Sequence, residues 1–225
     1  DPERSIPLLE TWRVAELFDA YQERYVALMN KKSVQYIQIF HNHGQASGAS
    51  IVHPHSQIVA IPVLDPDRTK SLHGAEEYYR QHKQNVFDVM LNFELENKER
   101  IVFENDDFVV LCPFASRAAF EMTIVPKRQN PYFERITNEE KMAVAEALQI
   151  ALLALYEGLN NPAYNFYIHT APCDGKDYQR YRWHIEIVPR TAIWGGFELS
   201  AGIEISTVAP EDAAAFLRET LHKAQ

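Results

Sequence analysis

The sequence has little cysteine, no long hydrophobic run and no excess of positive charge, and each of these shortages excludes a class of protein. Only two cysteines, Cys112 and Cys173, occur in 225 residues, and they form no CxxC pair, so neither a disulfide framework nor a cysteine-based zinc cluster is expected. No apolar run is long enough to span a bilayer. The opening stretch DPERSIPLLE has no basic region followed by an apolar one, so a cytoplasmic protein without a signal peptide is the default expectation.

The negative net charge argues against nucleic acid as a partner. The chain carries 22 Lys and Arg residues against 31 Asp and Glu residues, a net charge of −9, whereas nucleic-acid binding needs positive charge to neutralise phosphates. The composition is otherwise that of a globular protein, with 46% hydrophobic and 24% charged residues, and the length suits one large domain or two small ones. We therefore expect neither a nucleic acid nor a membrane as partner, and any anionic ligand must be attracted by local donors.

The most informative stretch is SGASIVHPHSQIVAIP, residues 47–62, in which two histidines and a glutamine occupy alternate positions. The run continues with apolar residues and ends at a proline, which predicts a short buried strand. Because alternate residues of a strand share a face, His53, His55 and Gln57 are expected to point the same way. Buried polar side chains need partners, so three on one face indicate a prepared polar site. A solvent-facing polar edge is the alternative.

A loop of small and polar residues, residues 44–50, precedes this stretch and favours a ligand site over a plain polar edge. Gly44 and Gly48 allow the backbone to approach a ligand closely, and successive N–H groups in such a loop can hold an anion. Taken alone, the loop would indicate only a turn. Together, the loop and the three alternating polar side chains predict an anion-binding site.

The two halves of the chain contain similar segments, which indicates an internal repeat. Residues 36–62, YIQIFHNHGQASGASIVHPHSQIVAIP, resemble residues 164–189, YNFYIHTAPCDGKDYQRYRWHIEIVP. Each begins with an aromatic-rich strand that ends in a histidine, His41 or His169, and continues through a polar loop into a second strand. The polar positions of these second strands correspond in order, with His53, His55 and Gln57 matching Arg182, His184 and Glu186.

A helix is predicted ahead of each pair of strands. In the second half, Thr137 and Glu140 form a capping box, and apolar residues recur behind it at helical spacing. In the first half, residues 10–29 carry a stripe of apolar and tyrosine residues that indicates packing. Residues 101–128 add further strands ahead of the second helix, and the first half has no counterpart to them.

We therefore expect an α+β fold of two similar repeats, with antiparallel sheets, packed helices and an incomplete first repeat. The first repeat spans residues 1–64, and the second repeat, with a C-terminal segment, spans residues 101–225. Residues 65–100 connect them as a polar turn followed by a surface helix from about Ala75. Since the first repeat lacks leading strands, its sheet edge is expected to be irregular or covered.

The HPHSQ motif within this repeat resembles the galactose-1-phosphate uridylyltransferase family, a two-repeat branch of the histidine triad superfamily. The segments FHNHGQASGASIVHPHSQ, VPKR, WHIEIVPR, GGFELSAGIEIS and APEDAAAFLR occur in the order expected of the family, over almost the whole chain. The segment GFELSAG also resembles the adenylyl-transferring relatives that phosphorolyse ADP-glucose. The resemblance implies two histidine-triad-like repeats, of which the first lacks its N-terminal part.

The resemblance implies a double displacement. The middle histidine of the motif, His55, attacks the α-phosphorus of a nucleoside diphosphate sugar and sugar 1-phosphate leaves. A second sugar phosphate, or inorganic phosphate, then collects the nucleotidyl group. The alternative for His55 is a structural histidine satisfied by a backbone carbonyl. The first choice is exchange of UDP-glucose with galactose 1-phosphate, and an ADP-glucose phosphorylase is the alternative. Imidazole suits this step because its ordinary pKa of ~6.5 leaves a free lone pair at neutral pH, so no separate base is needed.

The same resemblance assigns roles to neighbouring residues. Gln57 donates its amide N–H to the non-bridging phosphate oxygens. The phosphate or ribose of the nucleotide is contacted by residues ahead of the motif, which are Asn42, Gly48 and Ser50. The hexose is contacted by Phe197 and Glu198, for which an ordinary strand–turn–strand with Phe197 in the core is the alternative. Family members are dimers whose active sites take residues from both subunits, so a homodimer is expected.

A bound metal is implied only in part. His53 matches a zinc ligand of the family, but the upstream ligands are absent from this chain. A second zinc site of several relatives falls on residues unsuited to zinc, which argues for no metal there: Asn85, Asp88, Gln129 and Arg182. We hypothesise an Arg182–Asp88 salt bridge in its place. The metal site of other relatives falls on His169, His184 and Glu186, for which a hydrogen-bonded His–Glu network is the alternative.

Three functions follow from these observations. The first is a nucleotidyltransferase, the second a nucleotide phosphohydrolase in which water discharges the His55 adduct, and the third a non-catalytic relative that binds a nucleotide or a partner protein. Gln57 favours transfer, because simple hydrolases of the superfamily usually carry a third histidine at that place. The sequence specifies neither the base, uridine or adenosine, nor the acceptor.

Overall fold

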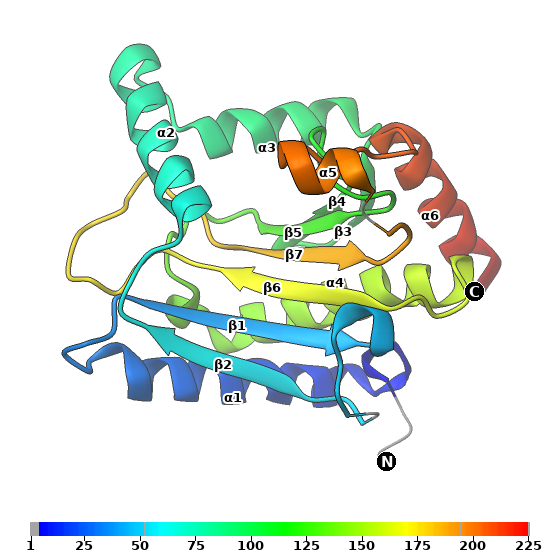
Figure 1. Ribbon diagram of the computed structural model, residues 1–225, viewed down its shortest axis with the longest axis horizontal. Coiled ribbons are helices and arrows are strands. Elements are labelled where there is room, and N and C mark those ends of the chain that lie inside the picture. The colour runs from blue at the N-terminus through cyan, green and yellow to red at the C-terminus, as the bar shows by residue number, and fades with distance from the viewer. Residues whose placement is uncertain (1–4, 52, 194, 225) are drawn as a thin grey trace.

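Short apolar segments from both halves of the chain build one antiparallel sheet. The computed structural model describes residues 5–51, 53–193 and 195–224. Its sheet has 7 strands in the order β2-β1-β6-β7-β5-β4-β3, and neighbouring strands are antiparallel (Figure 1). The strands are β1 (Tyr36–His43), β2 (Ser56–Ile61), β3 (Ile101–Glu104), β4 (Phe108–Leu111), β5 (Met122–Pro126), β6 (Tyr164–His169) and β7 (His184–Pro189).

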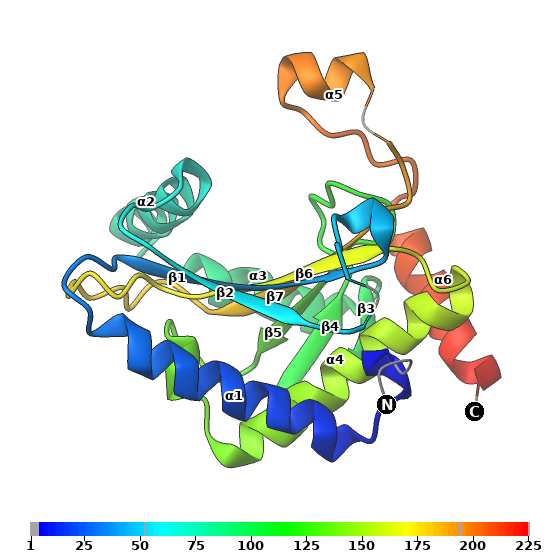
Figure 2. The same ribbon diagram turned by 60° about the horizontal axis from the view of Figure 1, so that its bottom comes forward.

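Helices cover both faces of the sheet. The helices α1 (Thr11–Met29) and α4 (Asn138–Gly158) pack on one face, and α2 (Pro66–His82) and α3 (Val86–Asn97) lie on the other (Figure 2). The helix α6 (Pro210–Ala224) packs against α4 and β3, whereas α5 (Gly196–Ala201) stands away from the body on an arm (Figure 2). Short 3-10 helices span Ile6–Leu8, Gln45–Ser47 and Phe133–Arg135. Among the residues described, no helix is long and apolar enough to cross a bilayer.

The two long helices form where the sequence predicts them, and their apolar stripes enter the core. Thr137 accepts from the N–H of Glu140, and the carboxylate of Glu140 accepts from the N–H of Thr137, which is the predicted capping box. The apolar residues behind this box and two tyrosines of α1 are all buried: Val144, Leu148, Leu152, Leu155, Tyr21 and Tyr25. The tyrosine stripe is therefore a packing surface, as expected.

The internal repeat gives the sheet an approximate two-fold symmetry. The strands β1 and β6 pair in its centre, with Phe40 opposite Tyr167. The strand β2 flanks β1 on one side as β7 flanks β6 on the other. In consequence Gln57 pairs with Phe40 as Glu186 pairs with Tyr167. The predicted α+β class, with antiparallel strands and packed helices, is confirmed.

The strand β2 ends the sheet, and its outer edge is open within the described residues. On the opposite side β7 continues into β5, β4 and β3, whereas β2 pairs with β1 alone. The pairing of β1 with β2 runs without a bulge from Tyr36 opposite Ile61 to His41 opposite Ser56. The pairing of this edge strand is thus regular among the described residues, and a covered outer edge stays a prediction.

The strand of the HPHSQ motif begins later than the alternation of its residues suggests. It starts at Ser56, so His53 and His55 precede β2 instead of belonging to it. Pro54 has no backbone N–H to donate to a strand ladder, which explains the late start. The motif histidines therefore lie on a turn that leads into the sheet, and only Gln57 lies within the strand.

The connector between the halves is helical from Pro66, not from Ala75. Asp65 caps α2 by accepting from the N–H of Arg68, and proline suits the first helical position because its missing N–H has no partner there. Lys83 takes a left-handed conformation (φ 57°) that ends α2, and α3 follows it. The connector therefore holds two helices, both on the sheet face opposite α1 and α4.

Candidate active site

Polar side chains gather on the sheet face that α1 and α4 leave uncovered. Along β1, His41 is buried on the core side. Ser56 of β2 also faces the core, where its hydroxyl lies 2.5 Å from the Tyr21 hydroxyl and 3.1 Å from Nδ1 of His41. Because side chains alternate along a strand, Asn42 and Gln57 face the opposite, open side. Gln57 is exposed there, and Asn42 is half-buried.

His55 holds its ring with one nitrogen bonded and the other available. Its Nδ1 lies 3.1 Å from the carbonyl oxygen of His53. A carbonyl oxygen can only accept, so Nδ1 donates and Nε2 keeps its lone pair. The ring is half-buried, and Nε2 makes no hydrogen bond to the part of the chain described. This is the tautomer required of a nucleophilic imidazole.

The loop of residues 44–50 lies between β1 and the motif. Gly44 and Gly48 have positive φ angles of 78° and 88°, which favour glycine. A Cβ added at Gly44 would lie 2.8 Å from Cβ of Ala163, so the loop packs tightly against the segment that leads into β6. The hydroxyl of Ser47 donates to the carbonyl of Gly44 at 2.7 Å. Ser50 is exposed on the same loop.

Asn42 is held by a residue from the second half of the chain. Its Oδ1 accepts a hydrogen bond from Nδ2 of Asn165 at 2.6 Å, and the same Nδ2 donates to the carbonyl of Ser47 at 2.9 Å. The Nε of Arg190 donates to Oδ1 of Asn165 at 2.8 Å. Neither Asn165 nor Arg190 stands out in the sequence. The available signal is the alternation in YNFYIH, which places Asn165 on the same face of β6 as His169.

The second half repeats the geometry of His55 beside a buried histidine, His169. The Nδ1 of His184 lies 3.0 Å from the carbonyl oxygen of Arg182. Nearby, Nε2 of His169 lies 2.7 Å from Oε2 of Glu186, and the rings of His169 and His184 are 5.0 Å apart. Burial lowers the pKa of His184 to about 4. Burial, together with the charge of Arg68, holds the pKa of His169 well below its ordinary value.

The hypothesised Arg182–Asp88 salt bridge is present. The guanidinium of Arg182 pairs with Asp88 and also donates to two backbone carbonyls at the end of β5, those of Pro126 and Lys127. Arg182 is 2% exposed, and this burial lowers its pKa, which the carboxylate of Asp88 opposes. At the two other positions Asn85 caps α3 and Gln129 donates to a backbone carbonyl at 2.7 Å. All four side chains are thus engaged within the chain.

The candidate metal ligands do not fit a metal ion. No group of three His, Cys, Asp or Glu side chains among the residues with a described placement is arranged to hold one. Glu186 accepts from His169 and pairs with the guanidinium of Arg117, whose positive charge disfavours a second cation. His184 bonds to a backbone carbonyl, and His53 is exposed. The side chains of the described residues form the alternative arrangement, a His–Glu hydrogen-bond network, which does not fit a metal ion, and no chemical step is derived through a metal.

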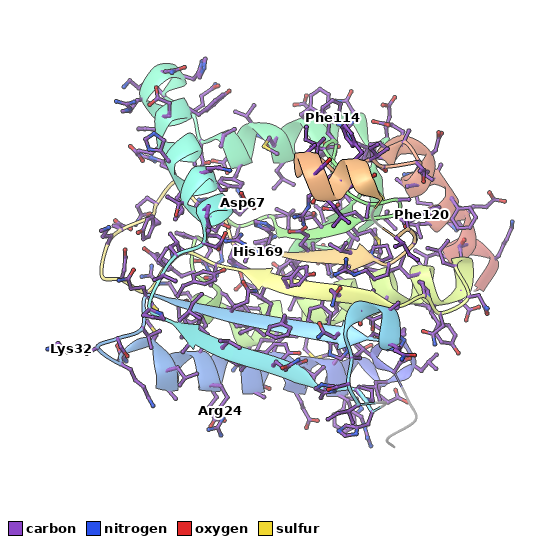
Figure 3. All side chains as sticks on the ribbon, in the orientation of Figure 1. Arg24, Lys32, Asp67, Phe114, Phe120 and His169 are labelled. Carbon is purple, nitrogen blue, oxygen red and sulfur yellow. The ribbon has the colours of Figure 1, made fainter. Side chains whose placement is uncertain are left out.

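A cavity of about 370 Å³ lies over this network. Its wall includes Asp67 at the start of α2 and His169 on β6 (Figure 3). Glu198 of the arm also lines it, whereas Phe197 does not and is 52% exposed. The arm segment forms the short helix α5, so the alternative of a strand–turn–strand with Phe197 in the core is wrong. His55 and Gln57 are not among the residues that line this cavity.

Comparison with known proteins bears on what this arrangement does. Residues 13–225 match the family model described as "Domain of unknown function (DUF4921)". The chain is 32% identical over 208 residues to the ADP-glucose phosphorylase of Arabidopsis thaliana, a match that covers 92% of this chain and 58% of that protein. It is 31% identical over 231 residues to the galactose-1-phosphate uridylyltransferase of Thermotoga maritima, with 98% and 71% covered.

The similarity extends to a solved structure. The crystal structure of the Arabidopsis thaliana ADP-glucose phosphorylase with bound ADP-glucose matches with a TM-score of 0.90 at 30% identity, over 97% of this chain and 70% of that one. The chain spans 58% of the length of the Arabidopsis relative and 51% of that of a Neurospora crassa galactose-1-phosphate uridylyltransferase. The chain belongs to the galactose-1-phosphate uridylyltransferase family.

Proposed function

We propose that His55 is the nucleophile of a nucleotidyl transfer between sugar phosphates. In the first step, Nε2 of His55 forms a bond to the α-phosphorus of a nucleoside diphosphate sugar. The α-phosphorus–oxygen bond to the β-phosphate breaks, and sugar 1-phosphate leaves with its electron pair. In the second step, a phosphate oxygen of the acceptor attacks the same phosphorus, the N–P bond breaks, and the imidazole recovers its lone pair.

The observation that carries this proposal is the hydrogen bond from Nδ1 of His55 to the carbonyl of His53, at 3.1 Å. It directs the lone pair to Nε2 and fixes the orientation of the ring. When Nε2 bonds to phosphorus, the ring gains positive charge, and the carbonyl dipole facing Nδ1–H stabilises that charge. The nucleophile therefore needs no general base beside it.

Hydrogen-bond donors near the motif are proposed to stabilise the negative charge on the non-bridging oxygens of the α-phosphate. Gln57 faces the open side one strand position beyond the core-facing Ser56. The side-chain oxygen of Asn42 accepts a hydrogen bond from Asn165, so the amide nitrogen Nδ2 of Asn42 remains able to donate to the ligand. The N–H of Gly48 already donates to the carbonyl of Gln45 at 3.0 Å, so the backbone N–H groups that follow it, at Ala49 and Ser50, extend this set. Such local donors offset the unfavourable overall charge of −9.

Two substrate pairs are proposed in order. UDP-glucose with galactose 1-phosphate comes first, supported by the similarity to a galactose-1-phosphate uridylyltransferase. ADP-glucose with inorganic phosphate comes second, supported by the similarity to an ADP-glucose phosphorylase. In either pair Glu198 accepts hydrogen bonds from sugar hydroxyls, and Phe197 packs against the sugar ring.

The arm supports the expectation of a homodimer. The helix α5 stands clear of the body in Figure 2, and its segment exposes large apolar side chains: Ile193, Phe197, Leu199, Ile203 and Ile205. A cluster of this kind on a soluble protein marks an interaction surface. We propose that two copies associate in the cytoplasm, and that neither a membrane nor a nucleic acid takes part.

An exchange assay tests the proposal. The chain is incubated with UDP-glucose or ADP-glucose labelled at the α-phosphorus, with and without galactose 1-phosphate or inorganic phosphate. We expect glucose 1-phosphate and acid-labile label on the protein, followed by acceptor-dependent discharge. His55→Ala should abolish both, and the matched surface variant His222→Ala should leave them unchanged. Acceptor-independent release of nucleoside monophosphate would indicate a phosphohydrolase, and binding without label would indicate a non-catalytic relative.

A further inference from the structure

A hydrogen-bonded chain joins the second half of the molecule to the candidate nucleotide site in the first half. It runs from Arg190, just beyond β7, through Asn165 on β6 to Asn42 on β1. Asn165 is 3% exposed and faces Asn42 directly in the β1–β6 register. Because the Asn165 carboxamide is buried among fixed hydrogen-bond partners, its oxygen and its nitrogen cannot exchange places.

The two ends of the Asn165 carboxamide are fixed by groups that have only one hydrogen-bonding role. The guanidinium of Arg190 can only donate, so the atom it meets at 2.8 Å must be the oxygen of Asn165. The carbonyl of Ser47 can only accept, so the atom it meets at 2.9 Å must be the nitrogen. Both constraints select the same orientation, in which Asn165 presents N–H to Asn42.

The orientation of Asn42 follows from that of Asn165. Because Asn165 presents a donor, Asn42 must turn its own oxygen toward it, at 2.6 Å. Its nitrogen is then directed away, on the side of the loop: a Cβ added at Gly48 would lie 4.0 Å from Nδ2 of Asn42. Without these hydrogen bonds, the two flipped orientations of the half-buried Asn42 amide would be close in energy. Asn42 would then present its oxygen to the ligand as readily as its nitrogen.

We propose that Asn165, held by Arg190, is a positioning residue that fixes the Asn42 amide with its N–H directed at an oxygen of the bound nucleotide. This inference rests on the proposed function, because it assumes that a nucleotide occupies the site beside the loop. Phosphate and ribose both offer oxygen acceptors, whereas the reversed amide would set oxygen against oxygen. Asn165 touches no reacting atom. It acts on the ligand through Asn42, and its second hydrogen bond, to the Ser47 carbonyl at 2.9 Å, ties the same amide to the loop.

The variant Asn165→Asp tests this orientation while keeping the partner of Arg190. The new carboxylate still accepts from the guanidinium, but it can no longer donate to Asn42, which must then turn its nitrogen inward. It also loses the hydrogen bond to the Ser47 carbonyl, and any loss of affinity through the loop appears as the additive part of the cycle described below. We expect the dissociation constant for unreacted nucleotide sugar to rise about 10-fold or more, the range for one misdirected hydrogen bond. Binding is measured by calorimetry in a His55→Ala background with UDP-glucose and with ADP-glucose, so that no turnover intervenes.

A double-mutant cycle separates positioning from a merely structural role. If Asn165 acts through Asn42, the pair Asn42→Ala with Asn165→Asp binds no more weakly than Asn42→Ala alone. Losses that add would overturn the inference. Should Asn165→Asp fail to fold, the same cycle is run with Arg190→Met, which removes the exposed residue of the Arg190–Asn165–Asn42 series. The expected loss of nucleotide-sugar affinity is then about 3-fold.

The outcomes distinguish this inference from the proposed function. Tight binding with a non-additive cycle, but no labelled protein from the unmodified chain, leaves the positioning role standing and removes the nucleotidyl-histidine. If the protein becomes labelled but the losses in the double-mutant cycle add, only the positioning role of Asn165 is disproved. Absence of nucleotide-sugar binding by the unmodified chain overturns both.

Discussion

His55 and His184 make the same hydrogen bond: Nδ1 of each ring donates to the carbonyl oxygen of the residue two positions earlier, at 3.1 and 3.0 Å. The same backbone turn therefore leaves Nε2 as the unprotonated nitrogen of the neutral ring in both halves. Both side chains are half-buried, but their surroundings differ. His184 lies 5.0 Å from the ring of His169 and has its pKa lowered to about 4 by burial, whereas His55 lies on the turn that leads into the edge strand β2. The same local geometry therefore occurs beside the His169–Glu186 network in one half and at the edge of the sheet in the other.

The loop glycines give a first prediction. Alanine at Gly44 or Gly48 must adopt a φ of 78° or 88°, which strains an L-residue by about 1–2 kcal/mol. At Gly44 the new methyl would also lie 2.8 Å from Cβ of Ala163, whereas at Gly48 the nearest atom is Nδ2 of Asn42 at 4.0 Å. Urea unfolding should therefore show Gly44→Ala to be the more destabilising of the two substitutions.

A second substitution controls for this explanation. Replacing Ala163 by glycine removes the atom that the new methyl would strike, so Ala163→Gly should recover part of the stability lost in Gly44→Ala and none of that lost in Gly48→Ala. Equal losses for the two glycine variants, or no recovery, would contradict the packing of the loop against the start of β6.

Buried His41 gives a prediction for pH dependence. Burial, reinforced by the nearby His43 and His55, lowers the pKa of His41 from 6.5 to about 4. The unfolded chain therefore takes up this proton first, so the stabilisation is complete above pH 6.5 and is lost as the pH falls toward 4. At about 1.4 kcal/mol per pKa unit, the loss reaches roughly 3 kcal/mol.

Urea unfolding between pH 7 and pH 4.5 measures this loss. The variant His41→Gln keeps a polar partner for Ser56 but cannot titrate, so its stability should fall less steeply over the same interval. His169 and His184 also have lowered pKa values and will contribute a remaining slope. An unchanged slope in His41→Gln would contradict the assignment of the pH dependence to His41.

The Arg182–Asp88 pair predicts that stability does not depend on metal. Since the guanidinium of Arg182 fills the position beside Asp88, treatment with a chelator should leave the melting temperature unchanged. Asp88→Ala should destabilise the chain by about 2 kcal/mol, less than for a fully buried pair, because Asp88 is partly exposed. A lowered melting temperature after chelation, with metal released in stoichiometric amount, would show that the salt bridge has been misjudged.

Phe197 separates a ligand-binding role from a packing role. Its ring is 52% exposed on α5 and has no place in the core, so Phe197→Ser should change stability by less than about 0.5 kcal/mol. Loss of its contact with the sugar should raise the KM for the sugar phosphate. Leu199→Ser, a similarly exposed change on the same helix, is the matched control and should raise this KM less. A stability loss in Phe197→Ser without a change in KM would assign the residue to packing.

The sequence predicts those parts of the molecule that local chemistry determines. The capping box of Thr137 with Glu140 and the apolar stripe behind it specify α4 within one turn, and the repeat specifies which strands correspond. Asp65 and Pro66 also mark the start of α2. The polar residues that follow them are typical of a turn, which is why the sequence predicts the helix only from about Ala75. The late start of β2 is likewise a consequence of Pro54, which the alternation of polar residues conceals.

Other features are long-range contacts and cannot be read from neighbouring residues. The bond from Asn165 to Asn42 joins residues 123 positions apart, and it becomes visible only when β1 and β6 pair. The same is true of Arg117 beside Glu186, which converts a candidate metal ligand into a member of an ion pair. Burial of the second-half histidines, and hence their lowered pKa, also depends on tertiary packing.

The most direct test of the account is to locate the covalent intermediate by mass spectrometry. The chain is mixed with nucleotide sugar, denatured at alkaline pH within the first turnover, digested, and its modified peptide sequenced. One nucleoside monophosphoryl group is expected on the peptide that contains His55, and none in His55→Ala. Modification of another residue, or turnover by His55→Ala at the rate of the unmodified chain, would contradict it.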